Sequence, residues 1–323
     1  MTQAATASAG GPIVAVEGLT RVFRRRGTPA LTALDAMTFQ IQPGEAVGYI
    51  GANGAGKSTT IKMLTGILAP TAGTARTCRL DPMRERRKLA RRIGVVFGQR
   101  SQLWWDLPLR ESFDILAAIH SIEPRRAARR IDRLAELLEM GPTLGQPVRS
   151  LSLGQRMRAE VAAALLHEPE LVILDEPTIG LDVLSKARLR EFLIEQRGEH
   201  GTTLFLTTHD MGDIERLCER VLVVDHGRLA FDGTLTGLAA TVGVDRVLVV
   251  DLDERAEPLH GIPHTQWLGS DGDGVRQRLA FDAADTTAAA VLAAVAQRAT
   301  VRDLRIEEPD IEQVVRRIYT ASR

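Results

Sequence analysis

The segment Ala46-Val-Gly-Tyr-Ile-Gly-Ala-Asn-Gly-Ala-Gly-Lys-Ser58 decides the fold of this chain of 323 residues. Residues 46–50 form a short apolar run of the kind that a strand buried on both faces requires. Residues 51–58 fit the pattern G-x-x-x-x-G-K-[ST] of a phosphate-binding loop. Over residues 58–68, apolar side chains then recur at helical spacing. A strand, a glycine-rich turn and a helix in this order predict a phosphate site at the edge of a parallel α/β sheet.

The loop has the composition that phosphate binding requires. Glycines allow consecutive backbone N–H groups to point at phosphate oxygens, and the helix N-terminus adds the positive end of its dipole. Lys57, one of only four lysines, is expected to reach the β- and γ-phosphates, and the Ser58 hydroxyl to coordinate Mg²⁺. A glycine turn that binds nothing is the competing interpretation, which the flanking strand and helix disfavour. The predicted nucleotide-binding residues of this loop are Gly51, Ala52, Asn53, Gly54, Ala55, Gly56, Lys57, Ser58 and Thr59.

A second predicted strand, residues 171–174, ends in the acidic pair Asp175 and Glu176. A carboxylate at the end of a buried strand is costly unless it is paired, and a Mg²⁺ on the phosphates would pair Asp175. Glu176 is placed to polarise the attacking water. The alternative is a helix cap, because Pro177 follows.

Strands alternate with helices through the first two thirds of the chain, which predicts a parallel sheet covered on both faces. Residues 100–167 are mostly helical in pattern. Further strands are predicted over residues 13–17, 37–41, 204–206 and 221–224. We therefore predict a flexible tail over residues 1–12 and an α/β domain with the phosphate site over residues 13–236.

Residues 237–323 have the pattern of a small α+β accessory domain. Strands are predicted over residues 246–252, 275–281 and 301–306, with an alanine-rich helix before the last of them. A final helix is predicted with Asp310 as its cap. Its apolar face comprises Ile311, Val314, Val315 and Ile318.

Composition excludes several classes of protein. The 41 basic and 41 acidic residues give a formal net charge of zero, which argues against nucleic acid as a partner. Arginines 125, 126, 129, 130 and 133 are interpreted as a solvated helix face. The longest apolar run has nine residues, whereas about 18 are needed to span a bilayer. Two cysteines and an N-terminus without a secretory pattern favour a cytoplasmic location.

The segment Leu151-Ser-Leu-Gly-Gln-Arg156 narrows the class of nucleotide hydrolase to which the phosphate loop and the acidic pair point. With it, residues 13–236 closely resemble an ABC-type ATPase: a P-loop NTPase cassette with a RecA-like parallel core, an antiparallel β subdomain and a helical subdomain. Gln99 resembles the Q-loop glutamine, and Asp182 in Thr178-Ile-Gly-Leu-Asp182 resembles the D-loop aspartate. His209 in Thr207-Thr-His-Asp210 resembles the switch histidine.

The resemblance implies a head-to-tail dimer, of two copies or of this chain with a similar ATPase, around two Mg²⁺-ATP. Ser152, Gly154 and Gln155 would contact the ATP held by the partner. His209 would hold the γ-phosphate and the attacking water. Gln99 would join Ser58 and Asp175 at the Mg²⁺, and Asp182 would link the two sites. By spacing alone, His209 could be a surface histidine and Gln99 an ordinary loop amide.

The chain departs from the family pattern in three places. Leu153 stands where the signature usually has glycine. Phe23 is the candidate to stack on adenine, but it is equally compatible with a place in the core. Of Trp104 and Trp105, one could be buried while the other faces a membrane subunit, or both could lie in the core of the helical domain.

Three functions compete. A soluble ABC-type ATPase acting on nucleic acid or ribosomes is disfavoured, because only 52 residues separate Gln99 from Ser152 and the chain holds one cassette. A P-loop GTPase needs an Asn-Lys-x-Asp motif, and Asn53 is the only asparagine. The remaining interpretation is the ATP-binding subunit of a transporter, peripheral on the inner membrane face through separate transmembrane permease subunits. It most resembles ABC-2-type exporters, including the drug and viologen efflux group, and an importer stays open.

Overall fold

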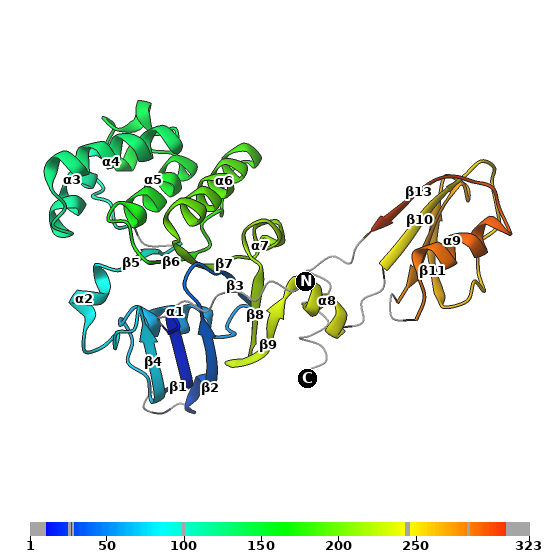
Figure 1. Ribbon diagram of the computed structural model, residues 1–323, viewed down its shortest axis with the longest axis horizontal. Helices are drawn as coiled ribbons and strands as arrows, with labels where there is room; N and C mark the ends of the chain where they lie inside the picture. Colours follow the sequence, from blue (N-terminus) through cyan, green and yellow to red (C-terminus); the bar gives the residue numbers. More distant parts are fainter. Residues whose placement is uncertain are drawn as a thin grey trace, which may run out of the picture. The chain divides into compact units, whose positions relative to one another are not determined.

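The computed structural model describes residues 11–24, 27, 29–98, 101–242, 246–282 and 285–307 (Figure 1). The predicted tail up to residue 10, Gln99, and the predicted final helix with its cap Asp310 lie outside the described residues. The chain divides into two compact units, residues 1–234 and 235–323.

A six-stranded sheet forms the centre of the first unit. In spatial order its strands are β5 (Ile93–Val96), β6 (Leu171–Asp175), β7 (Thr203–Thr207), β3 (Ala46–Gly51), β8 (Arg220–Asp225) and β9 (Arg228–Thr234). Neighbouring strands are parallel except for β9, which pairs antiparallel with β8. All six residues of β3 are buried. The parallel α/β sheet predicted from the apolar runs is therefore confirmed.

Three strands form a smaller antiparallel sheet. In spatial order they are β2 (Leu31–Ile41), β1 (Val14–Phe23) and β4 (Ala72–Thr77). One apolar core joins it to the central sheet. The ring of Tyr49 in β3 lies 6.1 Å from that of Phe39 in β2 and 5.0 Å from that of Phe205 in β7. These aromatic contacts fix the small sheet beside the strand that leads into the phosphate loop.

The helices of the first unit fall into two groups. Near the sheets are α1 (Lys57–Leu64), α2 (Arg86–Ala90), α6 (Val183–His200) and α7 (Met211–Leu217). A helical subdomain contains α3 (Leu109–Ile119), α4 (Pro124–Leu137) and α5 (Leu153–Leu165), with 3₁₀ turns η1 (Gly141–Thr143) and η2 (Val148–Ser150) (Figure 1). These three helices agree with the helical pattern predicted for residues 100–167.

One prediction for α4 is wrong in detail. The helix buries Ile131 and Leu134 and exposes most of its arginines, as an amphipathic surface helix should. Arg130, however, is not on a solvated face: its side chain is largely buried, and its guanidinium donates to Gln196 on α6 at 2.9 Å. Arg130 therefore packs the helical subdomain against α6.

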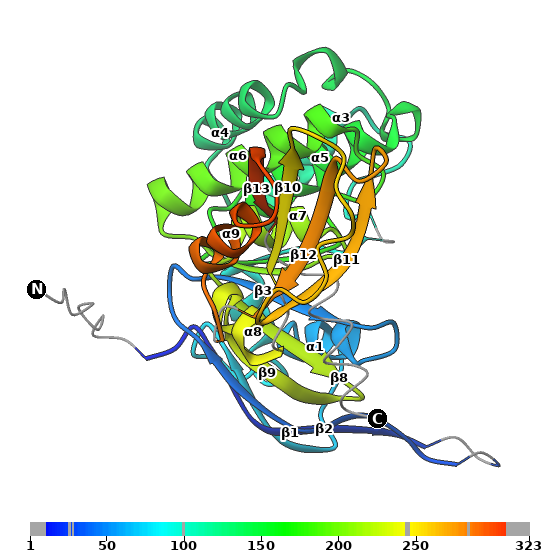
Figure 2. The same ribbon diagram turned by 90° about the vertical axis from the view of Figure 1, so that its right-hand side faces the viewer.

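The second unit begins with α8 (Leu235–Val242) and contains a four-stranded antiparallel sheet. Its strands, in spatial order, are β11 (Thr265–Asp271), β12 (Arg276–Phe281), β10 (Arg246–Leu252) and β13 (Val301–Glu307). The helix α9 (Ala288–Ala296) lies against one face of this sheet (Figure 2). Val291 and Val295 of α9 pack with Leu248 and Val250 of β10 into a separate small core, which gives the α+β architecture. Within the described ranges, no helix is both long and apolar enough to cross a membrane.

Candidate nucleotide-binding site

A cavity of about 650 Å³ opens at the carboxyl ends of β3 and β6. Ligand sites at this edge of a parallel sheet are typical of α/β folds, and the volume lies in the range of small-molecule pockets. The predicted site residues that line it are Phe23, Ala52, Asn53, Gly54, Gly56, Lys57, Ser58, Thr59, Asp175, Glu176 and His209. Residues from the phosphate loop and from the ends of β1, β6 and β7 thus meet in one place.

The shape of the phosphate loop depends on Gly56. Its φ of 110° lies in the left-handed region, where a side chain would be strained. A Cβ built there would lie 2.6 Å from Leu34 Cδ2 and 2.7 Å from the carbonyl oxygen of Ala33. Gly51 and Ala55 support the loop from behind, because Ala55 is buried and a Cβ on Gly51 would lie 2.6 Å from the Val224 carbonyl oxygen.

Lys57 is held against the loop that it serves. Only 9% of the residue is exposed, and its Nζ donates hydrogen bonds to the carbonyl oxygens of Gly51 at 2.6 Å and Ala52 at 3.3 Å. Burial lowers the pKa of the Lys57 ammonium, while the nearby carboxylates of Glu176 and Asp175 act in the opposite direction. The ammonium therefore lies between the phosphate loop and the acidic pair.

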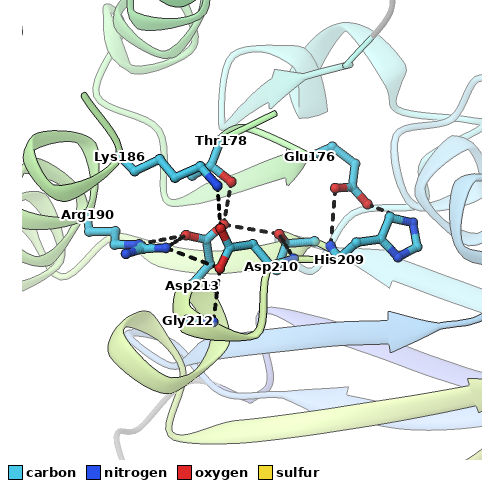
Figure 3. A network of polar contacts seen from close by, with 9 residues as sticks. Glu176, Thr178, Lys186, Arg190, His209, Asp210, Gly212 and Asp213 are labelled. Atoms are coloured by element: carbon cyan, nitrogen blue, oxygen red, sulfur yellow. Dashed lines mark hydrogen bonds and ion pairs between the residues drawn. The ribbon is translucent and has the colours of Figure 1, made fainter. Parts of the chain in front are cut away.

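The pairing of β6 with β7 places Asp175 opposite Thr207. It thereby brings together Glu176 and His209, which follow the two strands (Figure 3). Asp175 Oδ1 accepts a hydrogen bond from the Thr207 hydroxyl at 2.5 Å. Glu176 adopts a φ of 56°, which is uncommon for a residue with a side chain, and its N–H donates to the Thr207 carbonyl oxygen at 2.9 Å. Its carboxylate lies 3.3 Å from His209 Nε2. Backbone strain of this kind clusters at functional sites.

Asp175 and Ser58 fit a Mg²⁺ ion. Their carboxylate and hydroxyl oxygens are hard ligands, and both residues line the same cavity beside the phosphate loop. A carboxylate at the mouth of a buried strand also needs a positive partner. Gln99, the third predicted ligand, lies outside the described residues.

The signature residues lie elsewhere. Ser152 is the N-cap of α5: its hydroxyl accepts from the Gln155 N–H at 3.2 Å, and Gln155 Oε1 accepts from the Ser152 N–H at 2.9 Å. This capping box presents a helix N-terminus, a favourable place for an anion. As far as the structure describes it, the lining of the cavity does not include Ser152, Gly154 or Gln155.

Asp182 likewise caps a helix. Its carboxylate accepts from the Ser185 N–H at 2.9 Å and the Ser185 hydroxyl at 2.7 Å at the start of α6. The backbone hydrogen bond, followed by the hydroxyl bond, lowers the pKa of Asp182. Leu153 of the signature segment packs against Gly180 of the D-loop, since a Cβ on Gly180 would lie 2.2 Å from Leu153 Cδ2.

Phe23, Trp104 and Trp105 do not occupy the core positions that the sequence left open for them. Phe23 lies at the cavity wall rather than in the core, and the Arg21 guanidinium lies 4.6 Å from its ring centroid. Neither tryptophan is buried: Trp104 is 37% exposed and Trp105 is 50% exposed. The prediction that one or both rings lie in the core is therefore wrong. The guanidinium of Arg156, the last residue of the signature segment, instead lies over the Trp105 ring, 5.4 Å from its centroid, in a cation–π contact.

Sequence reasoning missed several residues of the site. Thr207, which orients Asp175, lies two residues before His209 and could have been found from that spacing. Ile67, Phe97 and Ile179 are further apolar residues of the cavity wall. No local pattern distinguishes these three from core residues, because only the folded chain brings them to one wall.

Comparison with known proteins identifies the class. The sequence matches the family model described as ABC transporter over residues 34–179. It is 37% identical over 218 residues to the daunorubicin resistance ATP-binding protein DrrA3 of Streptomyces coeruleorubidus, covering 68% of each chain. It is 36% identical over 231 residues to the Nod factor export ATP-binding protein I of Paraburkholderia xenovorans (strain LB400), covering 70% of this chain and 74% of that one.

The fold is similar to a solved dimeric structure of a bacterial ABC transporter cassette. The TM-score is 0.62 at 25% identity, covering 69% of this chain and 98% of that chain. Together with the P-loop cavity, these similarities define an ATPase with the ABC cassette fold. The chain belongs to the ABC transporter family, among its ATP-binding proteins.

Proposed function

We propose that this chain hydrolyses Mg²⁺-ATP in a head-to-tail dimer and thereby drives an ABC-2-type exporter built from separate permease chains. The observation that carries the proposal is the cavity in which Lys57, Asp175, Glu176 and His209 meet. These side chains supply a phosphate-binding cation, a metal ligand, a base and a polar partner in one place.

Each residue has a distinct task. Lys57 and the backbone N–H groups of residues 51–58 bind and orient the phosphates. When bound, Mg²⁺ held by Ser58 and Asp175 neutralises phosphate charge. Glu176 orients the attacking water and accepts its proton, and His209 holds the Glu176 carboxylate in place while it contacts the γ-phosphate.

A dimer is supported by an apolar surface beside the signature segment and the D-loop. Leu153, Ile179, Val183 and Leu184 flank Asp182 in sequence or contact the D-loop, and each is at least 43% exposed. Exposed apolar side chains gathered at one place mark an interface. The occupant we propose is a second copy of this chain. Ser152, at the N-terminus of α5, is not among the described residues that line the nucleotide cavity of its own chain, and in the dimer it would contact the ATP in the cavity of the partner. The similar bacterial cassette was solved as a dimer.

Export is supported by the relatives. Two similar proteins are named for daunorubicin resistance and for Nod factor export. The permease subunits would hold this chain on the inner face of the membrane and would choose the substrate. Residues 13–236 would form the ATPase domain, and residues 237–323 an accessory domain.

Affinity purification of the tagged full-length protein from membranes in mild detergent tests this function. The Glu176→Gln variant with MgATP would hold the assembly together, and Lys57→Ala serves as the control that loses ATP. We expect one or two multi-span permeases to be recovered with the first variant and fewer with the second. Recovery of ribosomes or DNA without a permease would overturn the transport role and leave the ATPase intact.

A further inference from the structure

Asp213 is a fully buried carboxylate that the proposed hydrolysis does not yet use. It lies in the first turn of α7, and none of its side chain is exposed. A buried charge is costly unless it is paired and hydrogen-bonded. The Arg190 guanidinium of α6 supplies the pair, with Nε at 2.6 Å from Asp213 Oδ1.

The second oxygen of Asp213 joins two loops of the site (Figure 3). Asp213 Oδ2 accepts hydrogen bonds from the Thr178 hydroxyl at 2.5 Å and from the Thr208 hydroxyl at 3.0 Å. Both threonines are buried. Thr178 lies two residues after Glu176, and Thr208 lies one residue before His209. One oxygen atom therefore bridges the two segments that carry the reacting pair.

The bridge through Asp213 connects the two chain segments just beyond the point where the pairing of β6 with β7 ends. The last residue pair between β6 and β7 is Asp175 with Thr207. Beyond it the two chain segments leave the sheet. The link joins them through the Asp213 side chain, none of which is exposed, whereas the side chains of Glu176 and His209 are 21% and 56% exposed. Asp210 reinforces the same corner, since it accepts from Lys186 Nζ at 2.5 Å and from the Gly212 N–H at 3.0 Å.

We propose that Asp213 is a positioning residue for ATP hydrolysis, which sets the separation of Glu176 and His209 by tying Thr178 to Thr208. The inference rests on the proposed function of the Glu176–His209 pair. Asp213 is not among the described residues that line the cavity. Its removal should therefore change the rate of the chemical step and leave ATP binding intact, because small displacements of reacting groups cost large factors in rate.

The test is steady-state ATP turnover of the purified full-length chain, normalised to the number of ATP-binding sites measured by equilibrium binding. We expect kcat per site to fall about tenfold for Asp213→Asn and about a hundredfold for Asp213→Ala, with KM changing less than about threefold. The matched control is Gln196→Leu on α6, which removes a different buried partner of an arginine and should leave kcat per site unchanged. A kcat per site within twofold of wild type for both Asp213 variants would overturn the proposal, as would a change confined to KM.

A double-mutant cycle separates positioning from general loss of stability. Thr178→Val should lower kcat several-fold in the wild type but have no further effect in Asp213→Asn or Asp213→Ala, because the bridge is already lost. Full additivity of the two effects would contradict the bridge, even if Asp213→Ala does not fold. Glu176→Gln is measured alongside. If that variant is inactive while the Asp213 variants are normal, only this inference fails; if it retains wild-type turnover, the proposed function fails with it.

Discussion

The Glu176 carboxylate contacts His209 twice: Oε1 lies 3.3 Å from the imidazole Nε2, and Oε2 accepts a hydrogen bond from the His209 backbone N–H at 3.2 Å. The two residues are 33 positions apart and follow neighbouring parallel strands. The double contact fixes the carboxylate in a direction that faces the cavity containing Lys57. A base held in one orientation is what a water-activating role requires.

Replacing Glu176 by glutamine should abolish turnover without abolishing ATP binding. The amide keeps the size of the side chain but cannot accept a proton, so the rate of phosphate release should fall by about 10²–10³. Glu199→Gln, a change of an exposed glutamate on α6, is the matched control and should keep the wild-type rate. Unchanged turnover in Glu176→Gln would remove this residue from the catalytic role.

Replacing Lys57 by alanine should weaken ATP binding. The Nζ is the one buried ammonium beside the described part of the phosphate loop, and charge-assisted contacts to phosphate are strong, so Kd should rise about ten- to a hundredfold. Titration with a fluorescent ATP analogue measures this change. Lys88→Ala, at an exposed lysine paired with Glu85, should bind as the wild type does. Normal affinity in Lys57→Ala would contradict the phosphate-loop assignment.

Phe23 should contribute stacking energy to the bound adenine. Because the ring forms part of the cavity wall, Phe23→Ala should raise the Kd for ATP about three- to tenfold with little change in Tm. Phe23→Tyr should restore wild-type affinity. Equal affinity of all three proteins would show that the adenine is held elsewhere.

The stacked rings of His120 and His167 should make stability depend on pH. The centroids are 3.9 Å apart, and burial, then the neighbouring His120, lower the pKa of His167 to about 4. The unfolded chain then binds more protons than the folded chain below about pH 6.5, so the stabilising effect of neutral pH is lost as the pH falls toward 4. Between pH 7 and pH 5 this difference amounts to about 2 kcal/mol of the free energy of unfolding.

Urea unfolding at both pH values checks this dependence. In His167→Phe, which keeps an aromatic ring but cannot be protonated, the loss of stability between pH 7 and pH 5 should be smaller by about that amount. His226→Gln, at an exposed histidine, should behave as the wild type. An equal pH dependence in His167→Phe and the wild type would show that this histidine titrates normally in the folded protein.

The parts of the fold that sequence predicted are those with a strong local pattern. The strands around Ala46–Gly51 and Leu171–Asp175 are apolar throughout because both faces are buried, and the phosphate loop has a fixed spacing. The strands Ala72–Thr77 and Thr265–Asp271 were not predicted. The first is at the edge of its sheet, and four of its six residues are exposed. The second has only two large apolar residues, Trp267 and Leu268, which are adjacent and therefore on opposite faces. Neither strand has an alternating apolar face to recognise.

The same division holds in the site. Lys57, Asp175 and Glu176 follow from motif chemistry at adjacent positions. The bridge from Thr178 through Asp213 to Thr208 could not be predicted, because these residues come from three segments that only the pairing of β6 with β7 brings together. The exposure of both Trp104 and Trp105 could likewise not be predicted from the sequence, since large aromatic residues are more often buried.

The central claim is that two copies of this chain complete one another's ATP sites. The most direct measurement is analytical ultracentrifugation of Glu176→Gln with and without MgATP, with Glu176→Gln/Leu184→Glu as the variant that charges the apolar surface beside the D-loop. We predict a monomer without nucleotide, a dimer with two bound ATP when nucleotide is present, and a monomer for the charged variant under both conditions. A Glu176→Gln protein that binds MgATP at full stoichiometry and stays monomeric would contradict the account.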